Sequence, residues 1–446
     1  MAAAAIEQII MNKQDDLNSL LAAATCALLG TTMANTAAAA DESSRWSLDS
    51  SMLYYGESDN RVQDVSAAIA AKRDFGDERL LGLSLTADTL TGASASGAIA
   101  LDGPQTFTSP SGRATYSTPA GEVPLDDTFK DTRFALNANW SQPLARLYNI
   151  SGGLGFSTEY DYQHIGANLG LSRDFNKRNT TLSTGLAWSE DSIDPVGGAP
   201  IPLSQMQDVG DNSNKLGSDT KSVLDFLLGL TQVIDRNTVL RVNYSYSHSS
   251  GYLNDPYKIL SVVDPSTGDT LARVPTTGPE GPTGIYVFEN RPDTRVKQSI
   301  YGELKRAFGA RVLNISYRFM TDDWGIDSNT AEVRMRWPLG DASYVEPQLR
   351  YYTQSEADFY RASLLNGEPL PQYASADFRL GQFDAVTLGV KFGRRTASGN
   401  EWSTRLEFYQ QSGTVPSEQI IGNQAGREQF PDLSAVIVQF GYSFRL

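Results

Sequence analysis

Residues 433–446 read LSAVIVQFGYSFRL and form the clearest strand pattern in the sequence. Large apolar side chains recur at every second position, with polar or small ones between them. The apolar set is Val436, Val438, Phe440, Tyr442, Phe444 and Leu446, and the intervening set is Gln439, Gly441, Ser443 and Arg445. A period of two places the two sets on opposite faces of a β-strand. The pattern predicts a strand with one apolar face, continuing to the final residue.

An aromatic, alternating strand in this position resembles the C-terminal signal by which outer-membrane barrels are recognised for insertion. We therefore predict that Phe440, Tyr442, Phe444 and Leu446 belong to a C-terminal insertion strand. Leu446 stands where this signal usually has Phe.

The rest of the chain after Asp41 repeats the alternation in segments of about ten residues, typical of a transmembrane barrel strand. The predicted strands are 45–55, 61–72, 79–90, 132–141, 147–157, 161–173, 179–190, 221–234, 237–249, 294–308, 311–321, 327–338, 343–354, 379–393, 401–411 and 433–446. They predict an all-β fold, a single transmembrane antiparallel up-and-down β-barrel of about 16 strands over residues 41–446.

The connections between these segments sort by length. If the first strand starts at the periplasm, the periplasmic turns are Asp74–Glu78, Gln142–Arg146, Asp174–Arg178, Asp235–Asn237, Gly309–Arg311, Leu339–Ala342 and Arg394–Asn400, and all are short. The long connections, 91–130, 191–220, 250–293, 355–378 and 412–432, then all fall on the extracellular side. Short inner turns with long outer loops are expected of such barrels, whereas a soluble β-sandwich has no reason to sort them.

Apolar positions on alternating strands predict the lipid face. Candidates are Leu81, Leu83, Leu85, Leu224, Phe226, Leu228, Leu230, Val386, Leu388, Val390 and Phe392. Aromatic residues gather at membrane interfaces, and five tryptophans stand near predicted strand ends: Trp46, Trp140, Trp188, Trp337 and Trp402.

The opposite faces carry charge and predict a lumen network. Its members are Lys297, Glu303, Lys305, Arg318, Glu332, Arg334, Arg336, Glu346 and Arg350. In a soluble protein these would form a solvated sheet face; in a barrel they point inward, because charge on the lipid face at mid-depth costs roughly 2–4 kcal/mol. The network either seals the barrel with salt bridges or lines a polar pore.

Composition and the N-terminus predict an exported protein. The net charge of −15 excludes the basic footprint of nucleic-acid binding. Residues 1–40 read as an upstream extension plus a secretory signal peptide with a small-residue cleavage site before Asp41. The single cysteine, Cys26, lies in this segment, so the mature chain would have no thiol chemistry. We expect export through the periplasm to the outer membrane of a Gram-negative bacterium.

Catalytic and metal-binding signals are sparse. The two histidines, His164 and His248, stand near predicted outer strand ends, where a barrel hydrolase would need a histidine beside a nucleophile. The spacing of the residues around these histidines does not identify a catalytic triad, and the alternative interpretation is that both histidines are ordinary polar residues at the surface. We predict that the protein is not an enzyme and has no cofactor or metal site. We expect the acidic pairs near the outer rim, such as Asp322 and Asp323, to be solvent-exposed loop residues rather than calcium ligands.

Several stretches resemble one family, the uncharacterised proteobacterial domain-of-unknown-function family 3570. They are DTLTGAS (88–94), STEYDYQHIGANLGLSRDFNKRNTTL (157–182), SSGYLNDPYKILSVVD (249–264), ENRPDTR (289–295), YRFMTDDWGIDSNTAEVRMRW (317–337) and EPQLRYYTQSEADFY (346–360). The resemblance implies an outer-membrane barrel and no assigned activity.

Three functions follow as hypotheses. The first is a channel or transport-related pore with a charged lumen. The second is a closed barrel scaffold for a secretion, electron-transfer or surface assembly, and the third is an outer-membrane hydrolase. Expected partners are outer-membrane lipid and lipopolysaccharide, the barrel-insertion machinery and periplasmic or surface proteins, with no nucleic acid. The third outer connection, around Glu159–Asp161, is too short for a porin-like constriction loop, so 91–130 and 250–293 are the candidate plugs.

Overall fold

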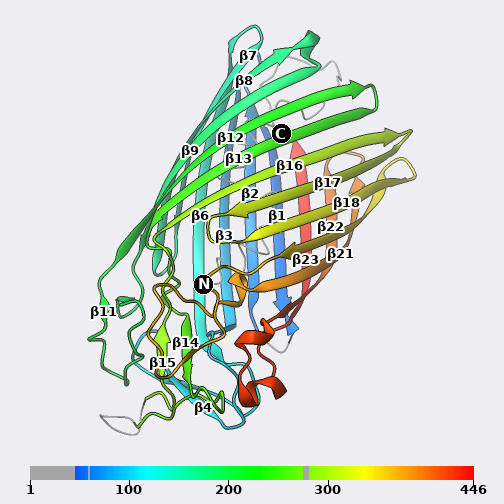
Figure 1. Ribbon diagram of the computed structural model, residues 1–446. Helices are drawn as coiled ribbons and strands as arrows, with labels where there is room; N and C mark the ends of the chain where they lie inside the picture. Colours follow the sequence, from blue (N-terminus) through cyan, green and yellow to red (C-terminus); the bar gives the residue numbers. More distant parts are fainter. Residues whose placement is uncertain (1–45, 59–60, 275–280, 446) are drawn as a thin grey trace.

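The computed structural model describes residues 46–58, 61–274 and 281–445, which form one closed antiparallel β-barrel (Figure 1). Its strands, in ring order, are β1 (Trp46–Glu57), β2 (Gln63–Asp74), β3 (Leu80–Ala95), β6 (Leu125–Ala145), β7 (Tyr148–Thr158), β8 (Tyr162–Phe175), β9 (Thr180–Ile193), β12 (Asp219–Asp235), β13 (Thr238–Gly251), β16 (Thr294–Phe308), β17 (Arg311–Asp322), β18 (Asp327–Leu339), β19 (Ser343–Gln354), β21 (Gln382–Arg395), β22 (Glu401–Thr414) and β23 (Leu433–Arg445). These sixteen strands overlap the predicted ones in the same order, which confirms the predicted barrel. The predicted signal segment, 1–40, lies outside the described residues.

The last strand closes the barrel, because β23 pairs with β22 on one side and with β1 on the other. In that register Phe440 lies opposite Met52, and the two side chains are 48% and 60% exposed on the outside. The apolar face predicted for the C-terminal strand is therefore the lipid face. Leu446 lies outside the described residues, and the insertion role of the strand stays a prediction.

Exposed apolar side chains surround the barrel. Leu85 on β3 is 51% exposed and lies opposite Ile69 on β2 and Leu136 on β6, which are equally exposed outside. Directly paired residues project from the same face of a sheet, so the apolar surface continues from strand to strand. A soluble protein rarely leaves such a band uncovered, whereas hydrocarbon covers it in a membrane.

The aromatic residues divide between the two ends of the strands. Trp46, Trp140, Trp337 and Trp402 lie near the periplasmic ends, whereas Trp188 lies in the outer half of β9. Tyr317 and Tyr351, in the outer halves of their strands, donate hydrogen bonds to Asn329 (2.6 Å) and Asp384 (2.7 Å) on neighbouring strands. Tyr244, at the middle of β13, donates to Gln298 (2.8 Å). Such amphipathic rings belong at the two membrane interfaces.

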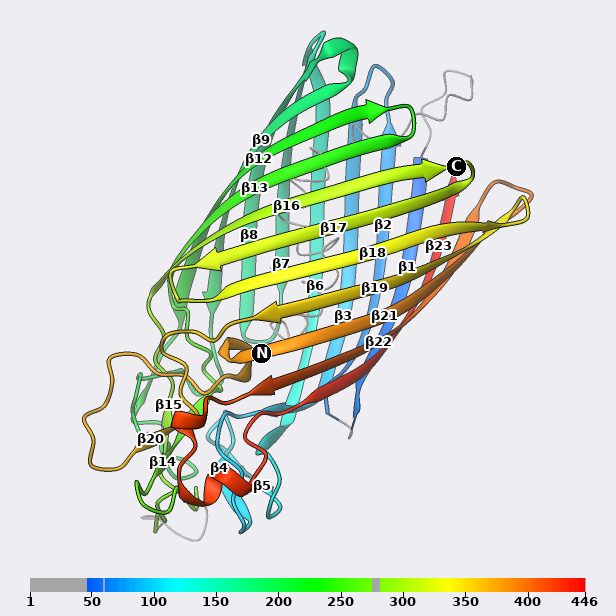
Figure 2. The same ribbon diagram turned by 45° about the vertical axis from the view of Figure 1, so that its right-hand side comes forward.

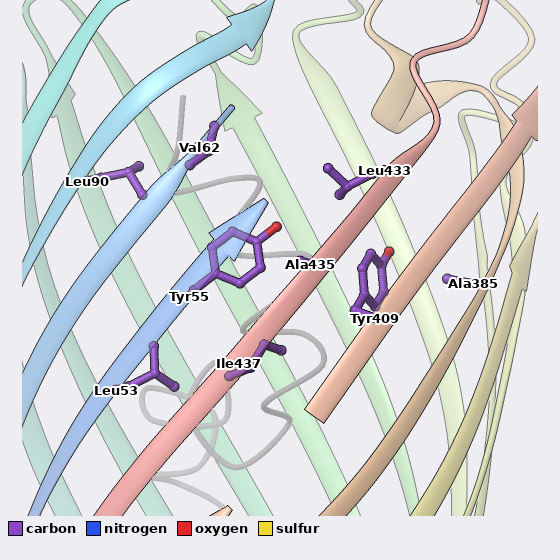
Figure 3. Close-up of a cluster of buried hydrophobic side chains, with 9 residues drawn as sticks. All are labelled: Leu53, Tyr55, Val62, Leu90, Ala385, Tyr409, Leu433, Ala435 and Ile437. Carbon is purple, nitrogen blue, oxygen red and sulfur yellow. The ribbon is translucent and has the colours of Figure 1, made fainter. Parts of the chain in front are cut away.

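An apolar cluster lies on the inner side where the ring closes (Figure 3). Its members are Leu53, Tyr55, Val62, Leu90, Ala385, Tyr409, Leu433, Ala435 and Ile437. On β1, Leu53 and Tyr55 are 7% and 1% exposed and alternate with the outward-facing Met52 and Tyr54. Burial of large apolar side chains contributes roughly 1.5–3 kcal/mol each, so this cluster stabilises the contact between the last strands and the first.

The connections sort by end, as predicted. The periplasmic turns are 75–79, 146–147, 176–179, 236–237, 309–310, 340–342 and 396–400. Gly309 and Gly340 have φ of 61° and 69° in these turns, a conformation that favours glycine. The outer connections are 58–62, 96–124, 159–161, 194–218, 252–293, 323–326, 355–381 and 415–432.

The long outer connections contain short elements that the sequence patterns did not predict. The strands are β4 (Gln105–Thr108), β5 (Thr115–Thr118), β10 (Ala199–Pro200), β11 (Lys215–Leu216), β14 (Ile259–Val263), β15 (Tyr286–Phe288) and β20 (Ser363–Leu365). They form the small sheets β4-β5, β10-β11 and β15-β14-β20, and Figure 2 shows β4, β5, β14, β15 and β20 together at one end of the barrel. The 3-10 helices of these connections are η4 (Phe378–Leu380), η5 (Ser417–Gln419) and η6 (Gly422–Gly426), whereas η3 (Asn176–Arg178) lies in the periplasmic turn between β8 and β9. Within the described ranges, no helix is long and apolar enough to cross a membrane.

Candidate functional site in the barrel lumen

Charged side chains of the strands from β13 to β22 point into the lumen. Strand pairing puts Arg241 opposite Glu303, and Glu332 opposite Arg350. Leu349, the neighbour of Arg350 along β19, is 50% exposed on the lipid side, whereas Arg350 is 3% exposed. Because successive residues of a strand face opposite sides, the charged set faces inward.

We call this lining the basic wall, because basic residues outnumber acidic ones on it among the described strands. The basic residues are Arg241, Arg295, Lys297, Lys305, Arg318, Arg334, Arg336, Arg350, Lys391, Arg395 and Arg405. The acidic residues are Glu303, Asp322, Glu332, Glu346, Glu401 and Glu407.

All nine residues of the predicted lumen network lie on the basic wall. They are Lys297, Glu303, Lys305, Arg318, Glu332, Arg334, Arg336, Glu346 and Arg350. The structure pairs several of them: Glu303 lies 3.1 Å from Arg241 and 3.5 Å from Lys305, and Glu332 lies 2.5 Å from Arg334. The network is therefore an ion-paired lining with a surplus of positive charge.

The remaining half of the ring has the opposite charge, and we call it the acidic wall. It carries Asp49, Glu57, Asp64, Asp74, Asp88, Asp131, Asp174 and Asp191 on the inner faces of β1, β2, β3, β6, β8 and β9. Against them stand Lys72 and Arg133, and β12 adds the inward-facing pair Lys221 and Asp225. Arg133 Nε lies 2.8 Å from Asp88 Oδ2, and Lys221 Nζ lies 2.8 Å from Asp191 Oδ2. None of these residues belongs to the predicted lumen network, although the same alternation of faces places them on inner faces.

The two walls face each other across the lumen. In the closed ring, β3 and β17 are eight strands apart among sixteen, and so are β6 and β18. Strands separated by half the ring lie on opposite sides of a barrel. The lumen is therefore flanked by a net negative side and a net positive side.

The two histidines have different environments. His164 faces the lumen, with Nδ1 2.6 Å from Asp191, which also lies 2.8 Å from Lys221. The other ring nitrogen of His164, Nε2, is buried, and within residues 46–58, 61–274 and 281–445 no serine hydroxyl forms a hydrogen bond with it. His248 lies opposite Leu224 on the lipid-facing side. These environments do not test the hydrolase hypothesis, which stays a prediction.

The outer loops fold into a cap that crosses the barrel mouth. We define the cap as residues 96–124, 194–218, 252–274, 281–293, 355–381 and 415–432. The loop after β3 and the loop after β13 leave the ring six strands apart, yet they bond to each other. The bonds run from Ile259 N to Ser96 O (2.9 Å), from Ile99 N to Ser261 Oγ (3.1 Å) and from Thr283 N to Thr106 O (3.0 Å). These are the two loops that sequence length marked as candidate plugs.

The cap has its own apolar packing. One cluster joins three loops and consists of Ala98, Phe107, Tyr116, Met206, Ile259, Tyr286 and Phe288. A second joins the loops before β16 and before β21, with Leu260, Val287, Leu364, Ala374 and Ala376. Phe107 and Tyr286 are fully buried, with ring centroids 4.7 Å apart. Aromatic burial of this kind is typical of a folded unit rather than of solvated loops.

A buried ionic cluster connects the same loops. Arg379 lies 2.5 Å from Asp255, and Arg291 lies 2.7 Å from Asp377. Lys258 donates to the carbonyl of Ala95 at the end of β3. Burial alone would raise the pKa of Asp377, but Arg379, Lys258 and Arg291 together hold it well below its usual range. Both carboxylates are thus ionised and fix the loops by charge-assisted bonds.

One acidic group at the outer rim has metal-ligand spacing. Carboxylate oxygens of Asp131, Glu159 and Asp161 lie within 4.8 Å of one another. Burial and the neighbouring Asp131 raise the pKa of Glu159 to about 8, so Glu159 is protonated at neutral pH. Asp161 accepts a hydrogen bond from Tyr257 of the cap. A shared proton and this hydroxyl account for the closeness of the three carboxyl groups.

Comparisons with known proteins give one family and several similar solved structures. No curated protein matches the sequence. Among solved structures, the chain is similar to the "CymD monoaromatic hydrocarbon channel", with 9% identity, TM-score 0.39 and coverage of 90% of this chain and 88% of that one. It is also similar to OccK5 (OpdH) of Pseudomonas aeruginosa, with 9% identity, TM-score 0.40 and coverage of 91% and 99%. A third structure, a "Bacterial polysaccharide outer membrane secretin", has 9% identity, TM-score 0.43 and coverage of 91% and 99%.

The family comparison covers nearly the whole chain. The model of a family described as "Protein of unknown function (DUF3570)" matches residues 18–444. The match confirms the resemblance carried by the sequence motifs, and the chain belongs to the DUF3570 family.

Proposed function

We propose that the protein is a non-catalytic channel in the outer membrane of a Gram-negative bacterium, passing small hydrophilic solutes through its charged lumen. The observation that carries the proposal is the charge lining both walls inside a closed barrel whose outside is apolar. A barrel that served only as a membrane anchor could fill its interior with apolar side chains. An ion-paired but charge-rich lining is instead suited to water and polar solutes.

The location and assembly belong to the same proposal. The apolar band and its aromatic rims suit contact with outer-membrane lipid and lipopolysaccharide. The apolar C-terminal strand suits recognition by the barrel-insertion machinery during export through the periplasm. The family match is compatible with this location and assigns no solute.

Conductance of the purified, refolded protein in a planar lipid bilayer tests the channel. We expect discrete, reproducible conductance steps. Folding is checked separately by heat-shifted gel mobility, so that a silent bilayer with folded protein contradicts the proposal.

Ion selectivity then tests the role of the basic wall. Arg334→Gln with Arg336→Gln removes two inward positive charges, and we expect the reversal potential in a salt gradient to shift toward cations. Arg306→Gln is the matched control, because Arg306 stacks over Phe308 on the outer face of β16. Equal reversal potentials for the double variant and the parent would show that these arginines do not line the pore.

A closed scaffold is the second candidate, and the cap favours it. Loops from distant parts of the ring are packed and ion-paired across the mouth, which suits a barrel that presents a folded outer surface to a partner. Cross-linking in intact outer membranes, followed by purification, would recover a stoichiometric partner in this case. A silent bilayer together with such a partner would favour the scaffold over the channel.

A further inference from the structure

The two lumen walls carry opposite net charge over the whole ring, and this bears on the solute. On the basic wall, lysine and arginine outnumber carboxylates even after the ion pairs are counted. On the acidic wall, Asp49 is exposed to the lumen, and the carboxylates outnumber the cations even after the pairs Arg133–Asp88, Lys221–Asp191, Arg178–Asp174 and Arg61–Glu57 are counted. Ion pairs within one wall cancel locally, but the surplus of each wall does not. The surpluses produce an electric field directed across the lumen, perpendicular to the permeation path.

The charges that produce this field include residues in the periplasmic half of the barrel as well as residues near the cap. Asp49 is the fourth residue from the periplasmic start of β1, and Lys305 is the fourth residue from the periplasmic end of β16. The side chain of Lys305 is 55% exposed. Arg336 on β18 is also near the periplasmic end, with its side chain 38% exposed. Charges of both signs therefore lie within four residues of the periplasmic ends of their strands.

A transverse field acts differently on different solutes. An anion or a cation is attracted to one wall and repelled by the other, so the field gives either little net advantage. A zwitterion can turn its ammonium group toward the acidic wall and its carboxylate toward the basic wall, and it gains at both. A neutral solute of the same size must displace water that the field has oriented, without an equivalent gain.

We infer that the lumen selects small zwitterionic solutes, of the amino-acid type, over neutral solutes of equal size. The inference rests on the proposed channel function and adds the chemical class of the solute. The acidic wall supplies the attraction for the ammonium group, and the basic wall supplies the attraction for the carboxylate. The selection of zwitterions depends on the opposite charges of the two walls and not on the net charge of the lumen.

Liposome swelling with β-alanine and lactamide tests this directly, because the two are isomers and only β-alanine is a zwitterion at neutral pH. The parent protein should swell liposomes at least twofold faster in β-alanine than in lactamide. Asp49→Asn with Lys305→Gln removes one charge from each wall and keeps the net charge, and it should lower this ratio by at least a third. Arg306→Gln with Asp327→Asn is the control: it removes two charges from the faces of β16 and β18 that point away from the lumen. It also keeps the net charge, and it should leave the ratio unchanged.

The outcomes separate the inference from the channel proposal. If neither isomer nor a small neutral sugar such as arabinose enters the liposomes, the channel proposal fails. If both isomers enter at equal rates, the channel stands and the zwitterion inference is overturned. A high ratio that survives Asp49→Asn with Lys305→Gln would also overturn it, provided heat-shifted mobility shows that the variant is folded.

Discussion

Glu303 shows how single residues hold the lumen lining together. Its carboxylate accepts hydrogen bonds from Arg241 on β13 (3.1 Å) and from Asn314 on β17 (2.5 Å), so it links three neighbouring strands. Glu303 is 7% exposed. A buried carboxylate is tolerated only when it is paired in this way, and removing it leaves the guanidinium of Arg241 without its carboxylate.

We expect Glu303→Ala to destabilise the barrel by about 1–3 kcal/mol, the usual cost of leaving a buried polar partner unsatisfied. Glu303→Gln keeps an acceptor for Arg241 and Asn314 and should cost less. Urea unfolding in detergent micelles, followed by tryptophan fluorescence, measures both free energies of unfolding. Equal stability of the alanine variant and the parent would mean that water replaces the lost carboxylate.

At the outer rim, Glu159 predicts a pH dependence. Its folded-state pKa is raised to about 8 by burial and by Asp131, whereas an unfolded glutamate titrates near pH 4.3. The folded state therefore holds a proton that the unfolded state loses, and stability falls as pH rises from about 5 to 8. Above that window Glu159 is ionised in both states.

We expect Glu159→Gln to reduce this loss of stability, because glutamine resembles the protonated carboxyl group. The midpoint of the heat-shifted gel transition, measured at several pH values between 5 and 9, gives the slope for parent and variant. Glu122→Gln in an exposed part of the cap is the control and should keep the parental slope. Parallel curves for parent and Glu159→Gln would show that Glu159 does not titrate in this window.

At the scale of one strand, the alternation of faces makes a sharp prediction for β3. Leu85 faces lipid, and its neighbour Thr86 faces the lumen on the acidic wall, two residues from Asp88. Leu85→Lys should destabilise the barrel by roughly 2–4 kcal/mol, the cost of a lysine near the bilayer midplane. Thr86→Lys should cost far less, because the ammonium group enters water near a carboxylate. Folding yield and unfolding in lipid bilayers measure the difference, and equal effects would contradict the assigned faces.

The same alternation explains which elements the sequence could predict. A barrel strand repeats lipid-facing and lumen-facing positions over about ten residues, and this period alone located strands such as β17 and β23. The short strands of the cap have no such repeat: β14 and β15 are buried on most sides, and Ser261 is fully buried among apolar neighbours. Their pairing depends on distant loops meeting, which no local pattern encodes.

The lumen was predictable strand by strand but not as a whole. Alternation placed Arg334 and Glu346 on an inner face without any knowledge of the ring. The opposition of Asp49 to Lys305 needs the closed ring, because 256 positions separate them along the chain. The ionic pair Arg291–Asp377 likewise joins two loops whose approach depends on the barrel that carries them.

At the scale of the whole molecule, the cap and the lumen must work together. Loops from distant parts of the ring meet over the mouth, and their packing and ion pairs hold them there. If solutes pass through the barrel, the cap must rearrange or leave a path beside it. If the cap rearranges, the loop before β16 and the loop before β21 must separate. Conductance would then depend on whether the contact between these two loops can open.

A reversible cross-link between these loops tests that dependence. Asn290 and Ala374 exchange both backbone hydrogen bonds, at 2.9 and 2.8 Å, and such a pair has Cα atoms about 5.5 Å apart, within disulfide range. Cys26, the sole cysteine of the sequence, lies in the segment predicted to be removed, so Asn290→Cys with Ala374→Cys would supply the only thiols of the mature chain. We expect the oxidised protein to conduct at least twofold less than the same protein after reduction, with Asn290→Cys alone insensitive to reductant. Equal conductance in both redox states would mean that this loop contact stays closed during permeation and that solutes pass beside a static cap.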